Sequence, residues 1–147
     1  MRVSQDCVNL VKRCESFRAE PYLCQAGIPT IGYGTTHYAD GTAVSLDDAP
    51  VTEAQANDIM MAALNKTADT VTHYVRVPAT QHQFDALCSF AYNLGTEALR
   101  TSTLLQMFNN GEPGPASMQF GRWVHALGKV SAGLVNRRAA EMMLFLS

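Results

Sequence analysis

Residues 15–34 read ESFRAEPYLCQAGIPTIGYG. Within this stretch Glu15, Cys24 and Thr30 place an acid, a thiol and a hydroxyl at the spacing E-x8-C-x5-T, and Thr30 opens the run TIGYG. The three side chains fall where a predicted helix meets a predicted hairpin. The stretch therefore predicts a change of secondary structure and, at that junction, a candidate reaction site.

An amphipathic helix is predicted just before the stretch. Its apolar stripe consists of Val3, Cys7, Leu10, Val11, Cys14 and Phe17, which recur at helical spacing. Ser4 is a suitable N-cap, and Pro21 is expected to end the helix. Glu15 follows Val11 by four residues, so it lies at the edge of the stripe. We expect its carboxyl group to be partly desolvated and still able to reach a cleft.

The sequence changes character between residues 22 and 44, where glycines and β-branched residues become frequent. An Asp-Gly turn signal at residues 40–41 favours a β-hairpin or a three-stranded sheet. Strand alternation places Thr30 on the same face as Gly32 and Gly34. We expect these two glycines to let a ligand approach the backbone beside Thr30.

Helical signals dominate the rest of the chain. Thr52 with Gln55 and Thr80 with Gln83 form two capping boxes, and Gly95 is placed to end the second helix, which we expect to be the central one. Further helices are predicted at about residues 102–109, 115–125 and 134–145.

The predicted fold class is α+β, mainly α. A small β-hairpin lobe at about residues 20–50 and a larger helical lobe, at about residues 75–147 plus the N-terminal helix, are expected to flank an active-site cleft. Residues 1–147 are expected to form one domain.

Composition narrows the classes of partner. The formal net charge of -2 gives no general attraction to nucleic acid, and no apolar run approaches the roughly 20 residues of a membrane-spanning helix. Residues 1–10 lack the apolar core of a signal peptide. We therefore expect no nucleic-acid partner, no stable membrane association and accumulation in the cytoplasm.

The four cysteines are expected to be reduced, because nothing in the sequence indicates secretion. Cys7, Cys14 and Cys88 lie on apolar helical stripes and are interpreted as core residues. Cys24 lies outside these stripes, so for it a structural and a chemical role stay open. No Cys/His spacing indicates a zinc site, and no metal or cofactor is expected.

Other chemistries have weaker support. A Cys/His pair would have to use His37, His73, His82 or His125, and none comes with a local cysteine-protease signature. No G-x-S-x-G elbow supports Ser/His/Asp catalysis. Ring faces suitable for stacking on sugars belong to Tyr33, Tyr38, Tyr92 and Trp123, although core packing is the commoner role of such residues.

The sequence resembles the T4-type phage lysozymes, the endolysins of glycoside hydrolase family 24. The family signature is a Glu, an acid or Cys nine residues later, and a Thr six residues further that leads into T-I-G-x-G. The likeness continues through QFDAL at 83–87, FAYNLG at 90–95, STLL at 102–105, RW at 122–123 and GLVNRRAAE at 133–141. It covers nearly the whole chain and implies a lysozyme-like fold.

The resemblance implies hydrolysis of the β-1,4 bond between N-acetylmuramic acid and N-acetylglucosamine in peptidoglycan, without metal or cofactor. It implies that Glu15 is the general acid and that Thr30 helps to hold the attacking water. Tyr92 and Asn93 match a cleft-lining segment, and with Gly32 they are the expected substrate-binding residues.

Two residues depart from the usual family pattern. Cys24 stands where many members have Asp, so the second carboxylate that inverting glycosidases use is missing. Its thiol could act as a base, as a covalent nucleophile giving retention, or as a polar placeholder. Thr35 stands where many members have a histidine.

A salt-bridged scaffold is expected to join the first helix to the C-terminal lobe. Its members are Arg18, Arg137, Arg138 and Glu141.

The resemblance implies that residues 1–147 form a single lysozyme-like catalytic domain without a separate cell-wall-binding domain. The expected partner is a peptidoglycan glycan strand, bound by a monomer. The resemblance implies synthesis in the host cytoplasm and action on the periplasmic cell wall after release through a holin-type pore. Two alternatives stay open: a degenerate lysozyme that binds glycan without cutting it, and an enzyme that oxidation of Cys24 switches off reversibly.

Overall fold

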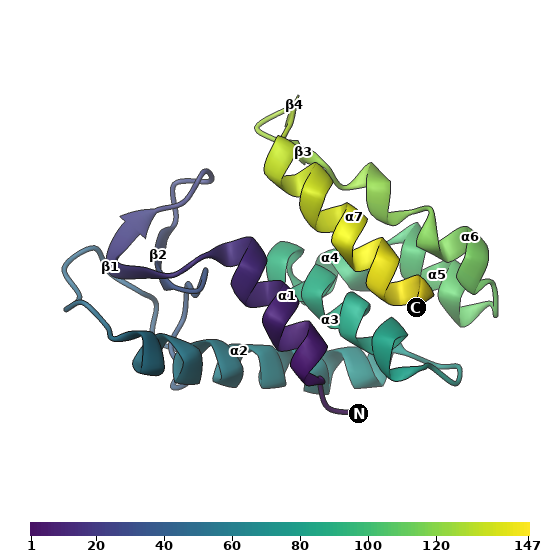
Figure 1. Cartoon of the computed structure of the whole chain (residues 1–147), viewed down its shortest axis with the longest axis horizontal. Helices are drawn as coiled ribbons and strands as arrows, with labels where there is room; N and C mark the ends of the chain where they lie inside the picture. Colours follow the sequence, from purple (N-terminus) through teal and green to yellow (C-terminus); the bar gives the residue numbers. More distant parts are fainter.

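The fold is described from a computed structural model of all 147 residues, in which a small hairpin follows the first helix and precedes a series of helices (Figure 1). The elements are, in order, α1 (Gln5–Glu15), β1 (Arg18–Leu23), β2 (Pro29–Gly32), α2 (Glu53–Tyr74), α3 (Gln81–Leu94), α4 (Thr96–Arg100), α5 (Thr103–Asn109), α6 (Pro113–Ser117), the 3-10 helix η1 (Phe120–Arg122), β3 (His125–Ala126), β4 (Lys129–Val130) and α7 (Ala132–Leu146). The long helix α2 runs beneath the hairpin at one end and beneath α3 at the other. This arrangement confirms the predicted α+β, mainly helical fold.

Helix α1 begins as predicted and ends earlier than predicted. The Ser4 side chain accepts a hydrogen bond from the Asp6 N–H and donates to the buried carboxylate of Asp85 on α3, so one residue caps α1 and joins it to the central helix. The helix ends at Ser16, whose φ of 58° is incompatible with a continuing right-handed helix. The prediction that Phe17 extends the helical stripe is therefore wrong, and Phe17 is 36% exposed.

Pro21 lies inside strand β1 and does not end a helix. The antiparallel pairing of β1 with β2 shifts register between Arg18 and Tyr22, where Pro21 lies. Proline lacks the N–H that a regular ladder needs, and such irregularities tolerate it. The β lobe, defined here as residues 18–50, consequently starts slightly earlier than the sequence indicated.

The end of β2 is shaped by two glycines with positive φ. Gly32 has a φ of 65° and Gly34 a φ of 73°, so regular strand alternation stops at Gly32. Gly32 is buried, and a Cβ there would lie 3.0 Å from the Cβ of Ala56 on α2. The expected glycine-lined face open to a ligand beside Thr30 is therefore absent. The Asp-Gly turn at residues 40–41 is present, closed by the isolated His37–Ala43 bridge and not by a third strand.

Helix α3 is the central helix, as predicted. Both capping boxes are formed, at Thr52 and at Thr80, and Gly95 is the C-cap of α3. Eight consecutive residues of α3, from Phe84 to Ala91, are buried, because α1, α2, α4 and α7 pack around it. All four cysteines are free; Cys7 and Cys88 lie in the core as expected, whereas Cys14 is half-buried.

The C-terminal region contains more breaks than the sequence indicated. The helices at 103–109 and 132–146 are close to their predicted bounds. A single helix at about 115–125 is wrong: α6 starts at Pro113, η1 follows, and residues 125–130 form a short hairpin. Gly128, with a φ of 77°, serves this hairpin turn. None of the helices combines the length and the apolar character that a membrane span requires.

Candidate active site

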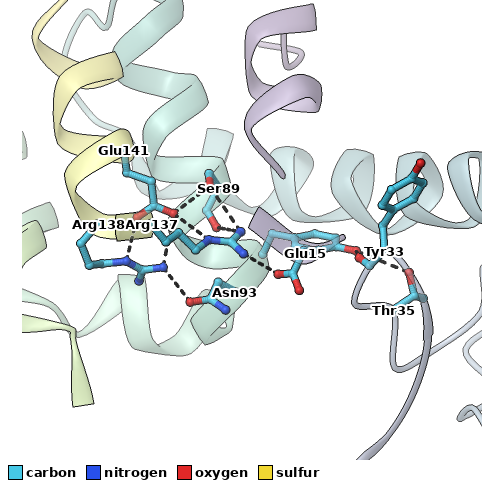
Figure 2. A network of polar contacts seen from close by, with 9 residues as sticks. Glu15, Tyr33, Thr35, Ser89, Asn93, Arg137, Arg138 and Glu141 are labelled. Atoms are coloured by element: carbon cyan, nitrogen blue, oxygen red, sulfur yellow. Dashed lines mark hydrogen bonds and ion pairs between the residues drawn. The ribbon is translucent and has the colours of Figure 1, made fainter. Parts of the chain in front are cut away.

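Glu15 is the last residue of α1 and lies at the junction with the hairpin. Its Oε1 accepts a hydrogen bond from Arg137 Nη1 at 2.5 Å, and its side chain is 18% exposed (Figure 2). Oε2 takes part in no hydrogen bond and lies against Gly34, where any Cβ would overlap the carboxyl group. One oxygen is thus fixed by the protein and the other is unengaged. The expectation of a partly desolvated acid at a junction is confirmed.

A buried network of charges holds Arg137 in place. Glu141 Oε1 accepts from Arg137 Nε at 3.2 Å, and Glu141 Oε2 lies 3.0 Å from Arg138 Nε. The Ser89 hydroxyl on α3 donates a hydrogen bond to Glu141 Oε1 at 2.7 Å, and the Ser89 carbonyl accepts one from Arg137 Nη2. Burial raises the pKa of Glu141, while Arg138, Arg137 and the Ser89 hydroxyl oppose that rise. The predicted scaffold between α1 and α7 is present.

Arg18 is not part of this scaffold, contrary to the prediction. Its guanidinium lies over the ring of Tyr22, 4.0 Å from the ring centroid, on the hairpin. Because Arg18 begins strand β1 and not a continuation of α1, its side chain follows the strand. Arg138 instead donates to Asn93 Oδ1 at 2.6 Å, which connects the scaffold to the end of α3.

Cys24 and Thr30 lie together at the tip of the β1–β2 hairpin. Thr30 is 2% exposed, and its hydroxyl donates to the Ile28 carbonyl at 2.8 Å. Partial burial acts to raise the pKa of Cys24, but the N–H groups of Ile28 and Ala26 and the Thr30 hydroxyl outweigh it and lower that pKa. The thiol therefore ionises more readily than an ordinary cysteine.

Tyr22 is a site residue that sequence reasoning missed. It pairs with Thr30 across the hairpin. Burial raises the pKa of Tyr22, and the charges of Glu15 and Cys24 raise it further. Tyr22 therefore lies within electrostatic reach of both the acid and the thiol. The signal that could have found it is its position two residues before Cys24, which puts both on the same face of a strand.

Tyr92 ties the end of α3 to the β lobe. Its hydroxyl donates to the Tyr33 carbonyl at 2.8 Å and lies 3.4 Å from the Thr35 hydroxyl. Burial is the main cause that raises the pKa of Tyr92 to about 12, so the phenol stays protonated. Thr35 is 3% exposed, and its hydroxyl provides a polar contact between the β lobe and α3.

A cavity of about 560 Å³ lies beside this contact. Its lining comes from residues 34–39 and Gly41 of the β lobe, from one face of α2, and from the ends of α3 and α4. Gly34 and Tyr92 belong to the lining, so the cavity adjoins the position of Glu15. The lining contains no acidic residue and two basic ones, His37 and Lys66.

The other candidate groups have different surroundings. Of the aromatic residues, Tyr38 and Tyr92 line the cavity, whereas Tyr33 is 4% exposed and Trp123 packs edge-on against Phe90 with ring centroids 5.3 Å apart. No histidine forms a hydrogen bond with a cysteine; His37 contacts the Thr36 hydroxyl at 3.0 Å. No cluster of three or more His, Cys, Asp or Glu side chains has a metal-binding arrangement.

Comparison with known proteins places this geometry in a family. The profile of the phage lysozyme family matches residues 12–141. The chain is 42% identical over 152 residues to the endolysin of Bacillus phage PZA, and it spans 56% of that protein's length. It is 36% identical over 147 residues to the endolysin of Salmonella phage P22, of which it covers 99%.

A solved structure agrees with the sequence comparisons. The endolysin from Escherichia coli O157:H7 phage FAHEc1 superimposes with a TM-score of 0.89 at 35% identity, over all of this chain and 94% of that one. The fold is therefore the α+β lysozyme-like fold. The profile match, the full-length relatives and the fold agree, and the chain belongs to the phage lysozyme family of hydrolases.

Proposed function

We propose that this lysozyme hydrolyses the β-1,4 bond between N-acetylmuramic acid and N-acetylglucosamine in peptidoglycan, for host lysis, with Glu15 as the general acid. The observation that carries the proposal is the environment of Glu15: Oε1 is held by Arg137 while Oε2 is unengaged and the side chain stays partly exposed. A proton on Oε2 can be given to the departing glycosidic oxygen without breaking the contact that fixes the residue.

Cys24 and Thr30 serve the attacking water in this proposal. The Thr30 hydroxyl donates its hydrogen to the Ile28 carbonyl, and in this proposal its oxygen lone pairs accept a hydrogen bond from that water. The lowered pKa of Cys24 favours a thiolate, which can take the proton from that water. We assign Cys24 the role of base, and inversion at the anomeric carbon is the expected outcome.

The cavity beside Tyr92 supports binding of the glycan strand. Its lining combines hydroxyl groups with the ring of Tyr92, which suits sugars that present both hydroxyl groups and apolar ring faces. We assign Tyr92 and Asn93 to substrate binding. In this assignment Gly32 acts indirectly: the absence of a side chain lets β2 pack closely on Ala56 of α2.

Product analysis on purified peptidoglycan tests the reaction. Wild-type protein should release new reducing muramic acid ends, and Glu15→Gln should reduce the rate at least about 100-fold, as expected for loss of a general acid. Glu97→Gln is a matched control, because Glu97 also pairs with an arginine but is exposed on α4. A 1,6-anhydro product would make the protein a lytic transglycosylase. Wild-type binding to peptidoglycan without cleavage would make it a binding protein.

The role of Cys24 has its own test. The base role predicts that Cys24→Asp is active and Cys24→Ala is strongly impaired, with the first-formed product inverted when its anomer is read by NMR. A retained anomer would assign Cys24 as a nucleophile instead. An unimpaired Cys24→Ala would leave it no chemical role. Reversible loss of wild-type activity on mild oxidation, absent in Cys24→Asp, would indicate redox control.

The cellular setting follows from the proposed reaction. Phage endolysins act on the host cell wall. In this proposal residues 1–147 form one catalytic domain that works as a monomer, accumulates in the host cytoplasm without stable membrane association, and reaches the periplasmic wall through a holin-type pore. Size-exclusion chromatography tests the monomer. Cell fractionation with and without a holin tests the route.

A further inference from the structure

Glu141 is the only acidic residue in the scaffold besides Glu15, and it is completely buried. Its two oxygens face two guanidinium groups, Arg137 and Arg138, and the Ser89 hydroxyl also donates to it. Every neighbour within hydrogen-bond distance is a donor, which is the arrangement an ionised carboxylate requires. The structure thus places one buried anion between two buried cations (Figure 2).

The first branch from Glu141 leads to the acid. Arg137 donates from Nε to Glu141 and from Nη2 to the Ser89 carbonyl, and its Nη1 donates to Glu15. A guanidinium is planar and rigid, so fixing two of its nitrogens fixes the direction of the third. The position of the Glu15 carboxyl group, 122 residues away in sequence from Arg137, is therefore set by Glu141 and Ser89.

The second branch leads to Asn93. Arg138 packs over the Phe90 ring at 5.1 Å and donates from Nη2 to Asn93 Oδ1 at 2.6 Å. Because the carbonyl oxygen of the Asn93 amide is occupied by this cation, its NH2 group must point the other way. Asn93 is half-exposed, so the scaffold presents a hydrogen-bond donor at the end of α3. Such a donor suits an acetamido carbonyl of the glycan.

The negative charge of Glu141 also affects the electrostatic environment of Glu15. Arg137 and Arg138 contribute two positive charges and Glu141 one negative charge, so the scaffold beside Glu15 carries a net charge of +1. Without the Glu141 charge the same carboxyl group would face +2. A general acid must hold its proton until the substrate is bound, and extra positive charge would remove that proton at lower pH.

We propose that Glu141 is a positioning residue that fixes Glu15 through Arg137, orients the amide of Asn93 through Arg138, and limits the positive charge that Glu15 faces. The proposal rests on the proposed role of Glu15 as general acid. The other titratable and charged groups around these carboxyls are Cys7 and Cys14 on α1, Tyr22 on β1, and Tyr92 on α3. The neutral forms of the two tyrosines and of the two cysteines leave the charge balance unchanged.

The first experiment measures proton binding directly. In Glu141→Gln, the titration of the Glu15 carboxyl carbon, followed by 13C NMR, and the alkaline limb of the activity profile should both move to lower pH. The expected shift is roughly one to two pH units, the effect of one unit charge across a guanidinium at an effective dielectric constant of about 20. Glu97→Gln should change neither quantity.

A second variant distinguishes an effect of charge from a general disturbance of the structure by Glu141→Gln. Glu141→Gln with Arg138→Gln removes one charge of each sign, so no extra cation is left beside Glu15. This double variant should restore the wild-type Glu15 titration and the wild-type alkaline limb. Its KM should nevertheless be several-fold higher than that of the wild type, because the Arg138 guanidinium no longer orients the Asn93 amide. A wild-type Glu15 titration in folded Glu141→Gln, or a displaced one in the double variant, would overturn the charge role. An unchanged KM in the double variant would overturn the orienting role. The NMR titration needs no activity, so a failure of Glu15 as general acid would be seen separately, in Glu15→Gln.

Discussion

Replacing Gly34 by alanine should separate a purely structural cost from a catalytic one. Gly34 has a φ of 73°, and a Cβ there would overlap the Glu15 carboxyl group. Gly111 has a φ of 80°, but a Cβ there would meet no atom within 4 Å, and Gly111 does not line the cavity. Both substitutions put an L side chain into the left-handed region, at a cost of about 1–2 kcal/mol in unfolding free energy. For a chain of this length that corresponds to a fall in Tm of roughly 2–8 °C.

Only Gly34→Ala should remove activity. The carboxyl group must move to make room for the methyl group, and Arg137 then loses its geometry. A displacement of about 1 Å at a reacting group can reduce the rate about 100-fold. The measurements are thermal unfolding and release of reducing ends from peptidoglycan, made on both variants. If Gly34→Ala is folded and as active as Gly111→Ala, the close packing of Glu15 on Gly34 is not what positions the acid, and the reasoning is refuted.

Three further changes test other parts of the structure. Cys24→Asp should move the acid limb of the activity profile well below its wild-type position, because a carboxylate (ordinary pKa about 3.9) ionises far below a thiol (about 8.5); an unmoved limb would contradict the base role. Ser4→Ala should lower the unfolding free energy by about 1–2 kcal/mol in a denaturant titration, since the cap of α1 and the bond to buried Asp85 are both lost; no change would show that neither contact matters. Phe120→Ala should cost about 3–5 kcal/mol by the same measurement, because the ring is fully buried between other aromatic rings; a cost near zero would mean that the core closes around the cavity.

Local signals account for the parts of the fold that the sequence predicted well. The caps at Ser4, Thr52 and Thr80 each involve side chains within three residues of the helix start, so the sequence carries the whole interaction. The early end of α1 is different. Ser16 adopts a positive φ that its residue type does not favour, and the demand comes from the turn into β1. Tertiary context decided that boundary, and it also decided the placement of Arg18.

The candidate site shows the same division. The signature and the long resemblance identified Glu15, Cys24 and Thr30, and the structure brings Cys24 and Thr30 together. The sequence could not show that Gly32 and Gly34 are needed inside the protein. Gly32 is needed because Ala56 packs against it, and Gly34 is needed because the Glu15 carboxyl group does. A glycine in a motif signals a close approach, but only the fold identifies what approaches.

The acid and the thiol are held by separate sets of contacts. Glu15 is fixed from the helical side by Arg137 and, through it, by Glu141. The contacts that lower the pKa of Cys24 come from residues 26–30 of its own hairpin. A change of residue at position 24 therefore leaves the placement of the acid intact and alters only the group that would act on water. In the proposed mechanism, this independence lets a thiol stand at the position where the family resemblance leads one to expect Asp. It also means that substitutions at Cys24 should change the pH profile of activity without changing the Glu15 titration.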